Sequence, residues 1–580
     1  MDNQEAKAKL SAALAEWLPS KMADWKVPGI GVAVVKDGEV ILAEGYGVRD
    51  QEQNLPVTAD TLFAIGSSSK AFAAASVALM VDEGKLEWDT PVRQYLPNFK
   101  LKDPVATEHM TPRDLLCHRS GLPRHDVLWY NSTATREQLL DRLRHLEPNK
   151  EFRAYWQYQN LMYMTAGYLA GKAAGTSWED LVRTRLFTPL GMKTANFSVD
   201  ESQTAPDFAR PYEAKDDEVR LMEFRNITEV GPAGSINASV NEMAQWVKFH
   251  LAKGKFGDQQ ILSEANARQL HSPQMVISEP IWKEMFGADV VTYGLGWFLH
   301  AFHGVTLIQH GGNIDGFSAL VSFIPDRNIG VVTLTNLNSN FLTEVTSFYI
   351  YELLMELEPE DWHGKMLSFV NKMRDEAKKA KEQSASDRKP NTQPSHPIAD
   401  YAGEFEHPGY GIMSVKETDG KLTATYNRLE MKVDHYHYDT FEATLETLDI
   451  NFKLQYLMDL KGNIDRLCVS LEPSIAPSTF TRMADASLKN RAFLDQFAGE
   501  YELMGMVLTV TVRGEDALLA SIPGQGDVIL EPFQGTTFNL KGMPGFSFEF
   551  VKQNDAVTEI KISQPNGTFT ATKRAAGGSA

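Results

Sequence analysis

The amino-acid sequence predicts an α+β domain, with one antiparallel sheet and packed helices, followed by two small all-β barrel domains. Three observations support this prediction. β-Rich runs stand at both ends of the first 357 residues, with helical segments between them. A charged, proline-containing stretch follows, and a six-residue pattern that opens at Asp400 then recurs from Gln496. At roughly 100–200 residues per domain, 580 residues accommodate about three or four domains.

Residues 1–357 are expected to form the first domain. Its first two β-rich runs flank Lys36-Asp37-Gly38, which is a strong hairpin signal. The β-rich runs are residues 30–35, 40–43, 306–310, 318–324 and 330–336. The clearest helical patterns are residues 4–24, 67–83 and 340–357, with further helical segments up to about residue 290. Because the strands come from both ends of the domain, we expect one antiparallel sheet covered by the intervening helices.

Residues 358–397 are predicted to be a charged helix and a linker rich in serine, proline and charge. Beyond them the pattern alternates as in β-strands, and each copy of the repeat opens one of two predicted domains, residues 398–487 and 488–580. A period that holds several strands indicates two whole β domains rather than a solenoid. Closed, lipocalin-like barrels are favoured because closure removes exposed strand edges.

Composition excludes several classes of protein. The formal net charge of −19 makes nucleic acid a poor partner. The two cysteines, Cys117 and Cys468, are too few for a disulfide framework or a cysteine metal site, and neither a metal nor a cofactor is expected. No uninterrupted apolar run approaches 18 residues, so no membrane span is expected. The polar start predicts a cytoplasmic protein, or a periplasmic or secreted one if a leader has been removed.

Ser67-Ser-Ser-Lys70 stands at the start of a predicted helix. Residues three apart on a helix share a face, so the Lys70 amine can lie beside the Ser67 hydroxyl and take its proton. The helix N-terminus also favours negative charge that develops near Ser67. Taken alone, the same four residues fit a helix-capping serine with a solvent-exposed lysine.

Two further motifs favour the catalytic interpretation. Tyr158-Gln-Asn160 can supply a phenol that shuttles a proton and an amide that holds a substrate, although a buried aromatic and a capping asparagine also fit. His310-Gly311-Gly312-Asn313 follows a β-rich run, and its glycines allow a close backbone approach to a ligand. In isolation a simple hairpin turn would explain the second motif.

Taken together, in this order, the three motifs resemble those of class C β-lactamases, DD-peptidases and the related esterases and D-aminopeptidases. The resemblance covers nearly all of residues 5–355. It includes the segments KDGEVILAEGYG at 36–47, MTPRDLLCHRSGLP at 110–123, FTPLGM at 187–192 and PAGSINASVNEMAQW at 232–246. The order of a catalytic domain and two barrels is similar to that of D-aminopeptidase, which says little about the substrate.

The resemblance implies a mechanism. Ser67 would attack a carbonyl carbon, Lys70 and Tyr158 would share acid–base duty, and Asn160 would orient the acyl side chain or Lys70. The backbone N–H groups of Ser67 and Asn313 would form the oxyanion hole. A departure from the family is His310, which stands where class C β-lactamases have a lysine. Because histidine is charged only part of the time near neutral pH, esters and amides without an obligatory carboxylate are favoured over β-lactams.

The sequence therefore predicts a serine hydrolase that acts on a small-molecule, short-peptide or ester substrate, with D-amino-acid peptides or amides and carboxylesters as leading candidates. Three alternatives stay open: a weak β-lactamase, a penicillin-binding sensor with little turnover, and a ligand-binding module in residues 398–580. The oligomeric state is also open, with a homodimer as one arrangement. His435-Tyr-His437-Tyr-Asp439 resembles part of a metallo-β-lactamase motif, but Thr440 replaces its last histidine, which favours a structural role.

Overall fold

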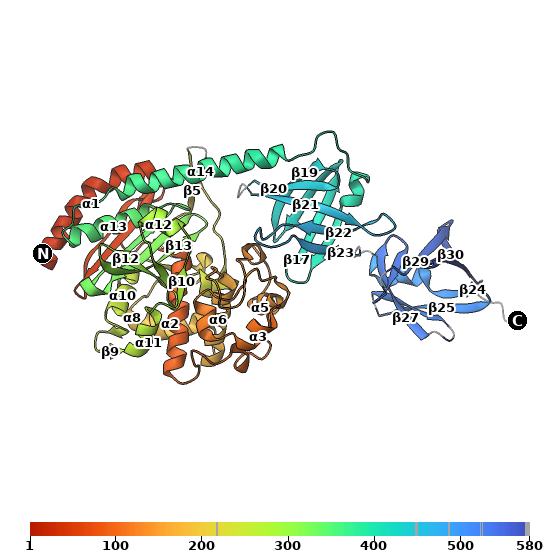
Figure 1. Ribbon diagram of the computed structural model, residues 1–580, viewed down its shortest axis with the longest axis horizontal. Coiled ribbons are helices and arrows are strands. Elements are labelled where there is room, and N and C mark those ends of the chain that lie inside the picture. The colour runs from red at the N-terminus through yellow and green to blue at the C-terminus, as the bar shows by residue number, and fades with distance from the viewer. Residues whose placement is uncertain are drawn as a thin grey trace. The chain divides into compact units, whose positions relative to one another are not determined.

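The structure is a computed structural model that describes residues 1–215, 218–446, 450–484, 488–514, 516–522, 524, 526–543 and 545–574. The chain divides into two compact units, one that ends at Asp387 and one that begins at Arg388 (Figure 1). The charged helix α14 (Trp362–Ser386) belongs to the first unit. The boundaries at 357, 397 and 487 stay predictions, and residues 485–487 lie outside the described residues.

The first unit contains a nine-stranded sheet whose paired strands all run antiparallel, which confirms the predicted α+β class. Its order is β10-β11-β12-β13-β14-β15-β1-β2-β3, so the N-terminal hairpin pairs with the C-terminal strand β15. The strands are β1 (Gly29–Lys36), β2 (Glu39–Asp50), β3 (Leu55–Pro56), β10 (Met275–Ile277), β11 (Val291–Tyr293), β12 (Phe298–Phe302), β13 (Val305–Ile314), β14 (Phe317–Ile324) and β15 (Ile329–Thr335). Strands from two distant parts of the first unit thus build one sheet, as the β-rich runs predict.

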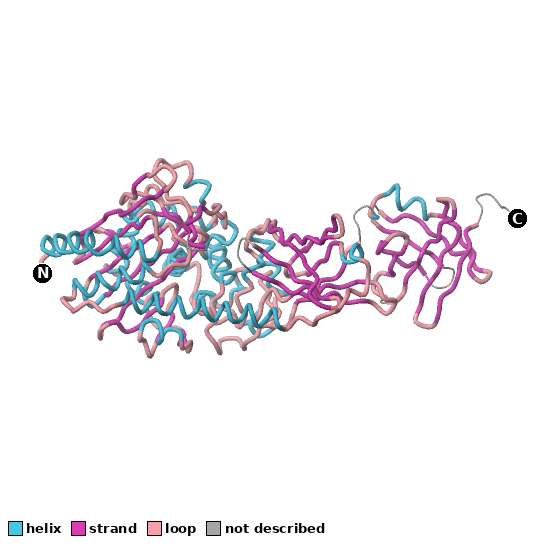
Figure 2. Tube along the Cα trace, turned by 90° about the horizontal axis from the view of Figure 1, so that it is seen from above, coloured by secondary structure: helices cyan, strands magenta, loops and turns pink. Residues whose placement is uncertain are grey.

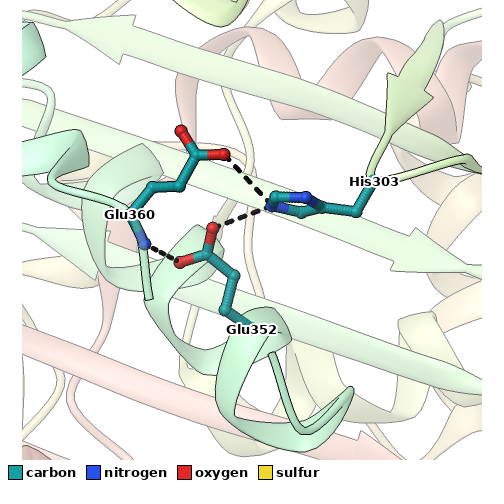
Figure 3. A group of neighbouring side chains, drawn as sticks. All are labelled: His303, Glu352 and Glu360. Atoms are coloured by element: carbon teal, nitrogen blue, oxygen red, sulfur yellow. Dashed lines mark hydrogen bonds and ion pairs between the residues drawn. The ribbon is translucent and has the colours of Figure 1, made fainter. Parts of the chain in front are cut away.

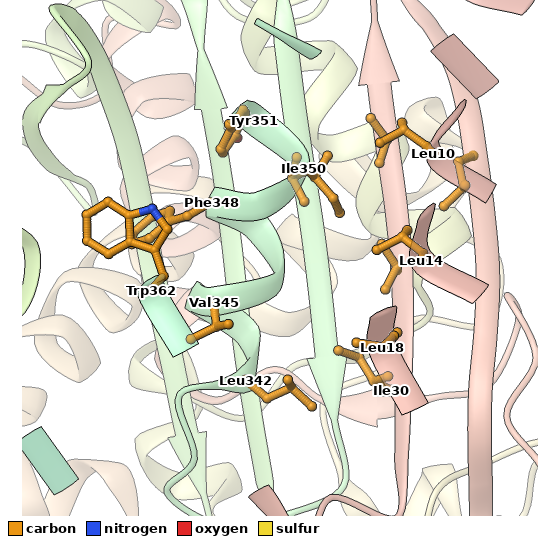
Figure 4. Packing of buried hydrophobic residues seen from close by; sticks show 14 of the residues in the cluster. Leu10, Leu14, Leu18, Ile30, Leu342, Val345, Phe348, Ile350, Tyr351 and Trp362 are labelled. Carbon is orange, nitrogen blue, oxygen red and sulfur yellow. The ribbon is translucent and has the colours of Figure 1, made fainter. Parts of the chain in front are cut away.

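One face of this sheet is covered by α1 (Asn3–Trp25) and α13 (Leu342–Leu354). Leu10, Leu14 and Leu18 of α1 recur every four residues, so they form one apolar stripe (Figure 4). The stripe packs with Ile30 of β1 and with apolar side chains of α13 in one buried cluster.

The opposite face is covered by α10 (Val240–Leu251), which approaches the sheet where β1 and β15 have glycines. A Cβ placed on Gly330 would lie 2.2 Å from a methyl carbon of Val247, and one on Gly31 would lie 2.9 Å from Val240. Helix α2 (Ser69–Asp82) packs against α6 (Asn160–Ala174) in the same unit. The other helices are α3 (Pro104–His109), α4 (Pro112–Leu116), α5 (Arg136–Arg142), α7 (Trp178–Val182), α8 (Thr188–Leu190), α9 (Val199–Ser202), α11 (Glu264–Leu270) and α12 (Ile281–Phe286).

Short strand pairs fix the loops between these helices. Strand β4 (Phe63–Ala64) pairs with β7 (Asn237–Ala238), directly before the predicted nucleophile. The other two pairs are β5 (Tyr212–Lys215) with β6 (Glu218–Leu221), and β8 (Lys255–Phe256) with β9 (Gln259–Gln260). The β4–β7 pair therefore ties the start of the Ser67 segment to the chain that leads into α10.

The second unit contains two closed eight-stranded barrels, which confirms the predicted barrel architecture (Figure 2). The first barrel has β16 (Gly403–His407), β17 (Gly411–Thr418), β18 (Lys421–Tyr426), β19 (Leu429–His437), β20 (Thr440–Leu445), β21 (Ile450–Met458), β22 (Ile464–Val469) and β23 (Ser478–Arg482). The second follows α15 (Arg491–Leu494) and has β24 (Gly499–Leu503), β25 (Met506–Arg513), β26 (Ala517–Ile522), β27 (Gly526–Gln534), β28 (Thr537–Leu540), β29 (Ser547–Gln553), β30 (Ala556–Gln564) and β31 (Gly567–Lys573).

The repeat residues Tyr401, Phe405, Phe497 and Tyr501 are all fully buried, so the repeated pattern supplies aromatic core to each barrel.

The predicted structural role of the His435–Asp439 segment agrees with its contacts. His435 Nε2 lies 2.9 Å from the Tyr438 carbonyl oxygen, and Asp439 Oδ1 accepts a hydrogen bond from the Ser395 backbone N–H at 2.9 Å. The Tyr401 hydroxyl also donates to Asp439. These side chains therefore tie β19 and its turn to neighbouring segments of their own barrel.

Glu352 is a fully buried carboxylate that joins three segments of the first unit (Figure 3). Its Oε1 lies 2.8 Å from His303 Nε2 and accepts from Trp362 Nε1 at 2.8 Å, and its Oε2 accepts from the Glu360 backbone N–H at 3.1 Å. The ligand atoms of His303, Glu352 and Glu360 lie within 4.8 Å of one another, close enough to share a cation. Because both Glu352 oxygens already accept hydrogen bonds, we interpret the group as a tie between the β12–β13 turn, α13 and the start of α14.

Glu352→Ala should lower the unfolding free energy of the first unit by about 2–5 kcal/mol, because each buried donor that loses its acceptor costs about 1–3 kcal/mol. The matched control Glu360→Ala removes a carboxylate that is 42% exposed, so it should cost less than about 1 kcal/mol. Urea unfolding followed by tryptophan fluorescence measures both. Equal losses in the two variants would contradict the assigned tie.

Candidate active site

Ser67 is the one partly exposed residue in a buried segment from Thr61 to Lys70. It lies in the single 3₁₀ turn Gly66–Ser68 that leads into α2. The neighbouring hydroxyls are engaged elsewhere: Ser68 Oγ donates to the His310 carbonyl oxygen at 2.9 Å, and Ser69 Oγ accepts from the Ile236 backbone N–H at 3.1 Å. The fold thus presents only the first hydroxyl of the three serines.

The Lys70 amine is fully buried and lies 3.0 Å from Ser67 Oγ. It also contacts Asn160 Oδ1 at 2.8 Å and the Ala233 carbonyl oxygen at 2.7 Å. The amide orientation of Asn160 is fixed because its Nδ2 donates to Asp126 Oδ1 at 2.9 Å, and a carboxylate accepts only. Burial, with help from the positive charge of Arg124, holds the Lys70 pKa well below its usual 10.5.

The partners of Lys70 determine where its lone pair points when the amine is neutral. A neutral amine has two N–H donors and one lone pair, and the oxygens of Asn160 and Ala233 can only accept. Both N–H groups are therefore used on these two oxygens. The lone pair is left for the Ser67 hydroxyl, which is the one partner that can donate a proton.

Tyr158 lies beside this pair. Lys70 Nζ is 4.7 Å from the centroid of the Tyr158 ring, and the Arg124 guanidinium carbon is 5.0 Å from it. Burial raises the pKa of Tyr158, while a hydrogen bond with the Ser67 side chain and the charge of Arg124 act in the opposite direction. The phenol therefore stays protonated near neutral pH.

His118 fixes the segment that carries Tyr158. Its ring lies 4.3 Å from the Tyr158 ring between centroids, and its Nδ1 accepts from the Gln159 backbone N–H at 2.9 Å. The Gln157 backbone N–H donates to the His118 carbonyl oxygen at 2.7 Å. The histidine is fully buried, so it acts on the site through the position of Tyr158.

The charge of His310 differs from the one that the sequence predicts. Burial, together with the charge of Lys70, lowers the His310 pKa to about 3, so the ring is neutral rather than partly charged near neutral pH. Its Nδ1 lies 2.6 Å from the Gly311 carbonyl oxygen and its Nε2 lies 3.0 Å from the Tyr293 hydroxyl. The carbonyl can only accept, so Nδ1 donates and Nε2 accepts from Tyr293. Both ring nitrogens are thus engaged inside the protein.

Gly312 brings β13 against the nucleophile segment. A Cβ placed on Gly312 would lie 1.9 Å from the Ile65 carbonyl oxygen and 3.0 Å from Ser67 N. Gly66 has φ +50°, and a Cβ there would lie 2.9 Å from Asn313 N. Gly312 therefore allows a close approach to the chain's own backbone. It places the amides of Ser67 and Asn313 on adjoining segments, as a two-donor oxyanion hole requires.

The structure thus brings together Ser67, Lys70, Tyr158, Asn160 and the segment 310–313, and it adds other residues. Arg124, Asp126, the Ala233 carbonyl and Tyr293 were missed. Two of these had a signal, because Arg124 directly follows the segment 110–123 and Ala233 is the second residue of 232–246. Asp126 and Tyr293 gave no signal, because each acts through a contact with a residue distant in sequence.

The comparison with protein families agrees with this geometry. The family model described as Beta-lactamase matches residues 14–353, more than half of the chain. The chain therefore belongs to the β-lactamase family. Residues 387–482, which include the first barrel, match the family described as Domain of unknown function (DUF3471).

Three relatives are similar to 60% or more of this chain, and two of them are named as hydrolases. Unguisins hydrolase ungD of Aspergillus violaceofuscus is 30% identical over 462 residues, which are 73% of this chain and 80% of that protein. Unguisins hydrolase ungD' of Aspergillus campestris is 29% identical, over 70% of this chain and 78% of that protein. Protein flp of Staphylococcus aureus strain MRSA252 is 26% identical, over 60% and 67%. The family and these named hydrolases support a hydrolase.

A solved structure shares the fold. The octameric penicillin-binding protein homologue from Pyrococcus abyssi aligns with a TM-score of 0.53 and 20% identity, over 97% of this chain and 99% of that one. Among the described residues, no helix has both the length and the apolar character that a membrane span needs.

Gly312→Ala should lower kcat about 10²-fold, because the added carbon forces β13 away from Ile65 and Ser67, and a shift of about 1 Å at a catalytic group can have that effect. Gly311→Ala is the matched control: its Cβ would meet its nearest neighbour, the Ala319 carbonyl oxygen, at 3.6 Å, and kcat should change only a few-fold. Steady-state hydrolysis of p-nitrophenyl acetate measures both. Similar rates for the two variants would contradict the assigned contact.

Proposed function

We propose that this protein is a serine hydrolase that forms an acyl-enzyme on Ser67 with ester or amide substrates. The observation that carries the proposal is the Lys70 amine, whose two acceptor-only partners leave its lone pair for the Ser67 hydroxyl. A serine hydroxyl is a weak nucleophile until a neighbouring base takes its proton.

The steps follow from the same contacts. Lys70 takes the Ser67 proton as Oγ attacks the substrate carbonyl carbon, and the Ser67 and Asn313 amides stabilise the negative oxygen. Tyr158 remains protonated and relays a proton to the leaving group, because its hydroxyl interacts with Ser67. The bond to the leaving group then breaks, which leaves the acyl-enzyme. Water attacks the acyl carbon and gives a proton to Lys70, the Ser67–acyl bond breaks, and that proton passes to Ser67 Oγ.

The charges around β13 favour substrates without a carboxylate. His310 is neutral, so the strand lacks the cation that class C β-lactamases have there. Glu344, in the first turn of α13, points an Oε1 to within 3.8 Å of the Cβ position of Gly311. Burial raises the Glu344 pKa to about 7, so this group is neutral or negative and does not attract a carboxylate. Esters, amides and short peptides, including those of D-amino acids, fit this site better than β-lactams.

The two unguisins hydrolases support the proposal that this protein is a hydrolase, because their names describe hydrolysis. The order of a catalytic domain and two barrels is similar to that of D-aminopeptidase, but this likeness concerns the layout alone and does not identify the substrate.

A penicillin-binding sensor would be labelled stoichiometrically and would not turn over its substrate, whereas a hydrolase turns over. The following experiment separates the two. A homodimer remains a prediction.

Ser67→Ala should reduce kcat by about 10³-fold or more, because removal of a nucleophile eliminates the acyl-enzyme route. Ser68→Ala is the matched control, since it removes a neighbouring hydroxyl and leaves the nucleophile, and it should retain most turnover. The assay is a panel of p-nitrophenyl esters, D- and L-amino-acid p-nitroanilides and nitrocefin. Substantial Ser67→Ala turnover would refute the proposal, and nitrocefin turnover that exceeds the other rates by orders of magnitude would refute the substrate class.

The pH profile of kcat/KM should have an acidic limb set by Lys70. Below its lowered pKa the amine is protonated and has no lone pair, so activity falls as pH falls through that pKa and reaches a plateau before pH 10.5. Because the His310 pKa is about 3, that ring adds no limb near 6.5. Lys70→Arg should be inactive at every pH, because a guanidinium stays protonated. Recovery of this variant at high pH would exclude Lys70 as the base.

A further inference from the structure

Residues 228–236 lie along the segment that carries the nucleophile and the general base. The Ala233 carbonyl oxygen accepts from Lys70 Nζ at 2.7 Å, and the Ile236 carbonyl oxygen accepts from the Ile65 backbone N–H at 3.0 Å. The position of this segment therefore decides whether Lys70 has its backbone acceptor in place.

Arg136, the first residue of α5, holds the start of the same segment. Its Nε donates to the Glu229 carbonyl oxygen at 2.9 Å, and its Nη2 donates to the Thr228 carbonyl oxygen at 2.6 Å. The Arg136 backbone N–H also donates to Glu229 Oε2 at 2.7 Å. These three bonds fix the first residues of the 3₁₀ helix Thr228–Ala233, and the last carbonyl of this helix is the acceptor of Lys70.

Glu179, in the first turn of α7, orients the Arg136 guanidinium. Its Oε1 accepts from Nη2 at 2.7 Å, and its Oε2 accepts from Nη1 at 3.4 Å. The Arg136 and Glu179 side chains are only 13% and 20% exposed. A Cβ placed on Gly231 would lie 3.2 Å from Arg136 Nη2 and 3.2 Å from Glu179 Oε1, so this ion pair lies directly against the middle of the 3₁₀ helix.

The 3₁₀ helix depends on such outside contacts. Hydrogen bonds within 3₁₀ helices have poor geometry, Val230 has non-helical angles (φ −100°, ψ 20°), and Pro232 has no backbone N–H to donate. Near its end the helix packs against α6, since a Cβ placed on Gly167 would lie 2.3 Å from Pro232 Cγ. The end of the helix is thus held by α6, and its start is held by Arg136.

We infer that Arg136 is a positioning residue for the general base: it holds the Ala233 carbonyl where that oxygen accepts from Lys70. This inference rests on the proposed function, in which Lys70 takes the Ser67 proton. Arg136 acts through the 3₁₀ helix. When the carbonyl moves away, one Lys70 N–H loses its acceptor, so the amine can turn and its lone pair no longer faces the Ser67 hydroxyl.

The experiment measures the pH profile of kcat/KM for p-nitrophenyl acetate in the wild type, Arg136→Ala and Gly231→Ala. Arg136→Ala removes the bonds to the start of the helix. Gly231→Ala retains the ion pair but inserts a carbon against it and at 2.9 Å from Ser235 Oγ, which displaces the helix. In both variants the plateau should fall about tenfold or more, because the base is misplaced.

The acidic limb of the profile separates positioning from a general loss of structure. A hydrogen bond to the ammonium form stabilises that form, so a displaced Ala233 carbonyl should move the limb about one pH unit toward lower pH in both variants. Loss of the Arg136 positive charge alone would favour the ammonium and move the limb toward higher pH. The charged and titratable groups that face Lys70 are retained in both variants: Arg124, Asp126, Tyr158, Tyr163, His118 and His310.

Two further variants serve as controls. Arg136→Lys keeps the charge and one donor group, so its plateau and limb should lie between those of the wild type and Arg136→Ala. Glu352→Ala lowers stability at the buried carboxylate that joins α13 and α14, and its acidic limb should coincide with that of the wild type.

The position of the limb decides the inference. If Arg136→Ala and Gly231→Ala fold and their limbs stay at the wild-type pH or move upward, the inference is wrong, and it is equally wrong if Glu352→Ala moves the limb as far. If thermal unfolding shows that Arg136→Ala does not fold, Gly231→Ala and Arg136→Lys decide by the same criterion. Failure of the proposed function has a different signature, which is wild-type turnover by Ser67→Ala or Lys70→Arg.

Discussion

The structure depends on one constraint: the buried amine of Lys70 has two partners that can only accept hydrogen bonds and one that can donate. The acceptors, Asn160 Oδ1 and the Ala233 carbonyl, use both N–H groups of the neutral amine, so the lone pair points at Ser67. Burial makes the neutral form accessible by lowering the Lys70 pKa. A helical spacing of three residues places Ser67 and Lys70 on one face. The two distant acceptors orient the Lys70 amine so that its lone pair faces the Ser67 hydroxyl.

The rest of the first unit positions the groups around this pair. Strands from both ends of the domain form one sheet, and α1, α13 and α10 cover its faces, so β13 has a fixed position. Gly312 then allows β13 to reach the backbone of Ile65 and Ser67. On the other side, His118 fixes the Tyr158 segment, and the start of α6 and the 3₁₀ helix Thr228–Ala233 carry the acceptors of Lys70. Four separate parts of the chain thus converge on one hydroxyl.

Local patterns predicted the fold class and the main site residues, whereas long-range contacts could not be predicted. Ser67 and Lys70 followed from helical spacing, and Tyr158, His310 and Asn313 from the resemblance to a family with the same motif order. The neutrality of His310 depends on its complete burial, which no local pattern predicts. The contact between Gly312 and Ile65 could not be predicted, because the two residues lie far apart in sequence. Asp126 reaches the site through its contact with Asn160, which is distant in sequence.

The central claim is that Ser67 becomes covalently acylated when Lys70 takes its proton. Intact-mass and peptide mass spectrometry of the full chain, quenched in acid during turnover of p-nitrophenyl acetate, measures this directly. The account predicts one acetyl group per chain on the peptide that contains Ser67, and none in Ser67→Ala. Label on another residue, or turnover without a covalent intermediate in either protein, would contradict it.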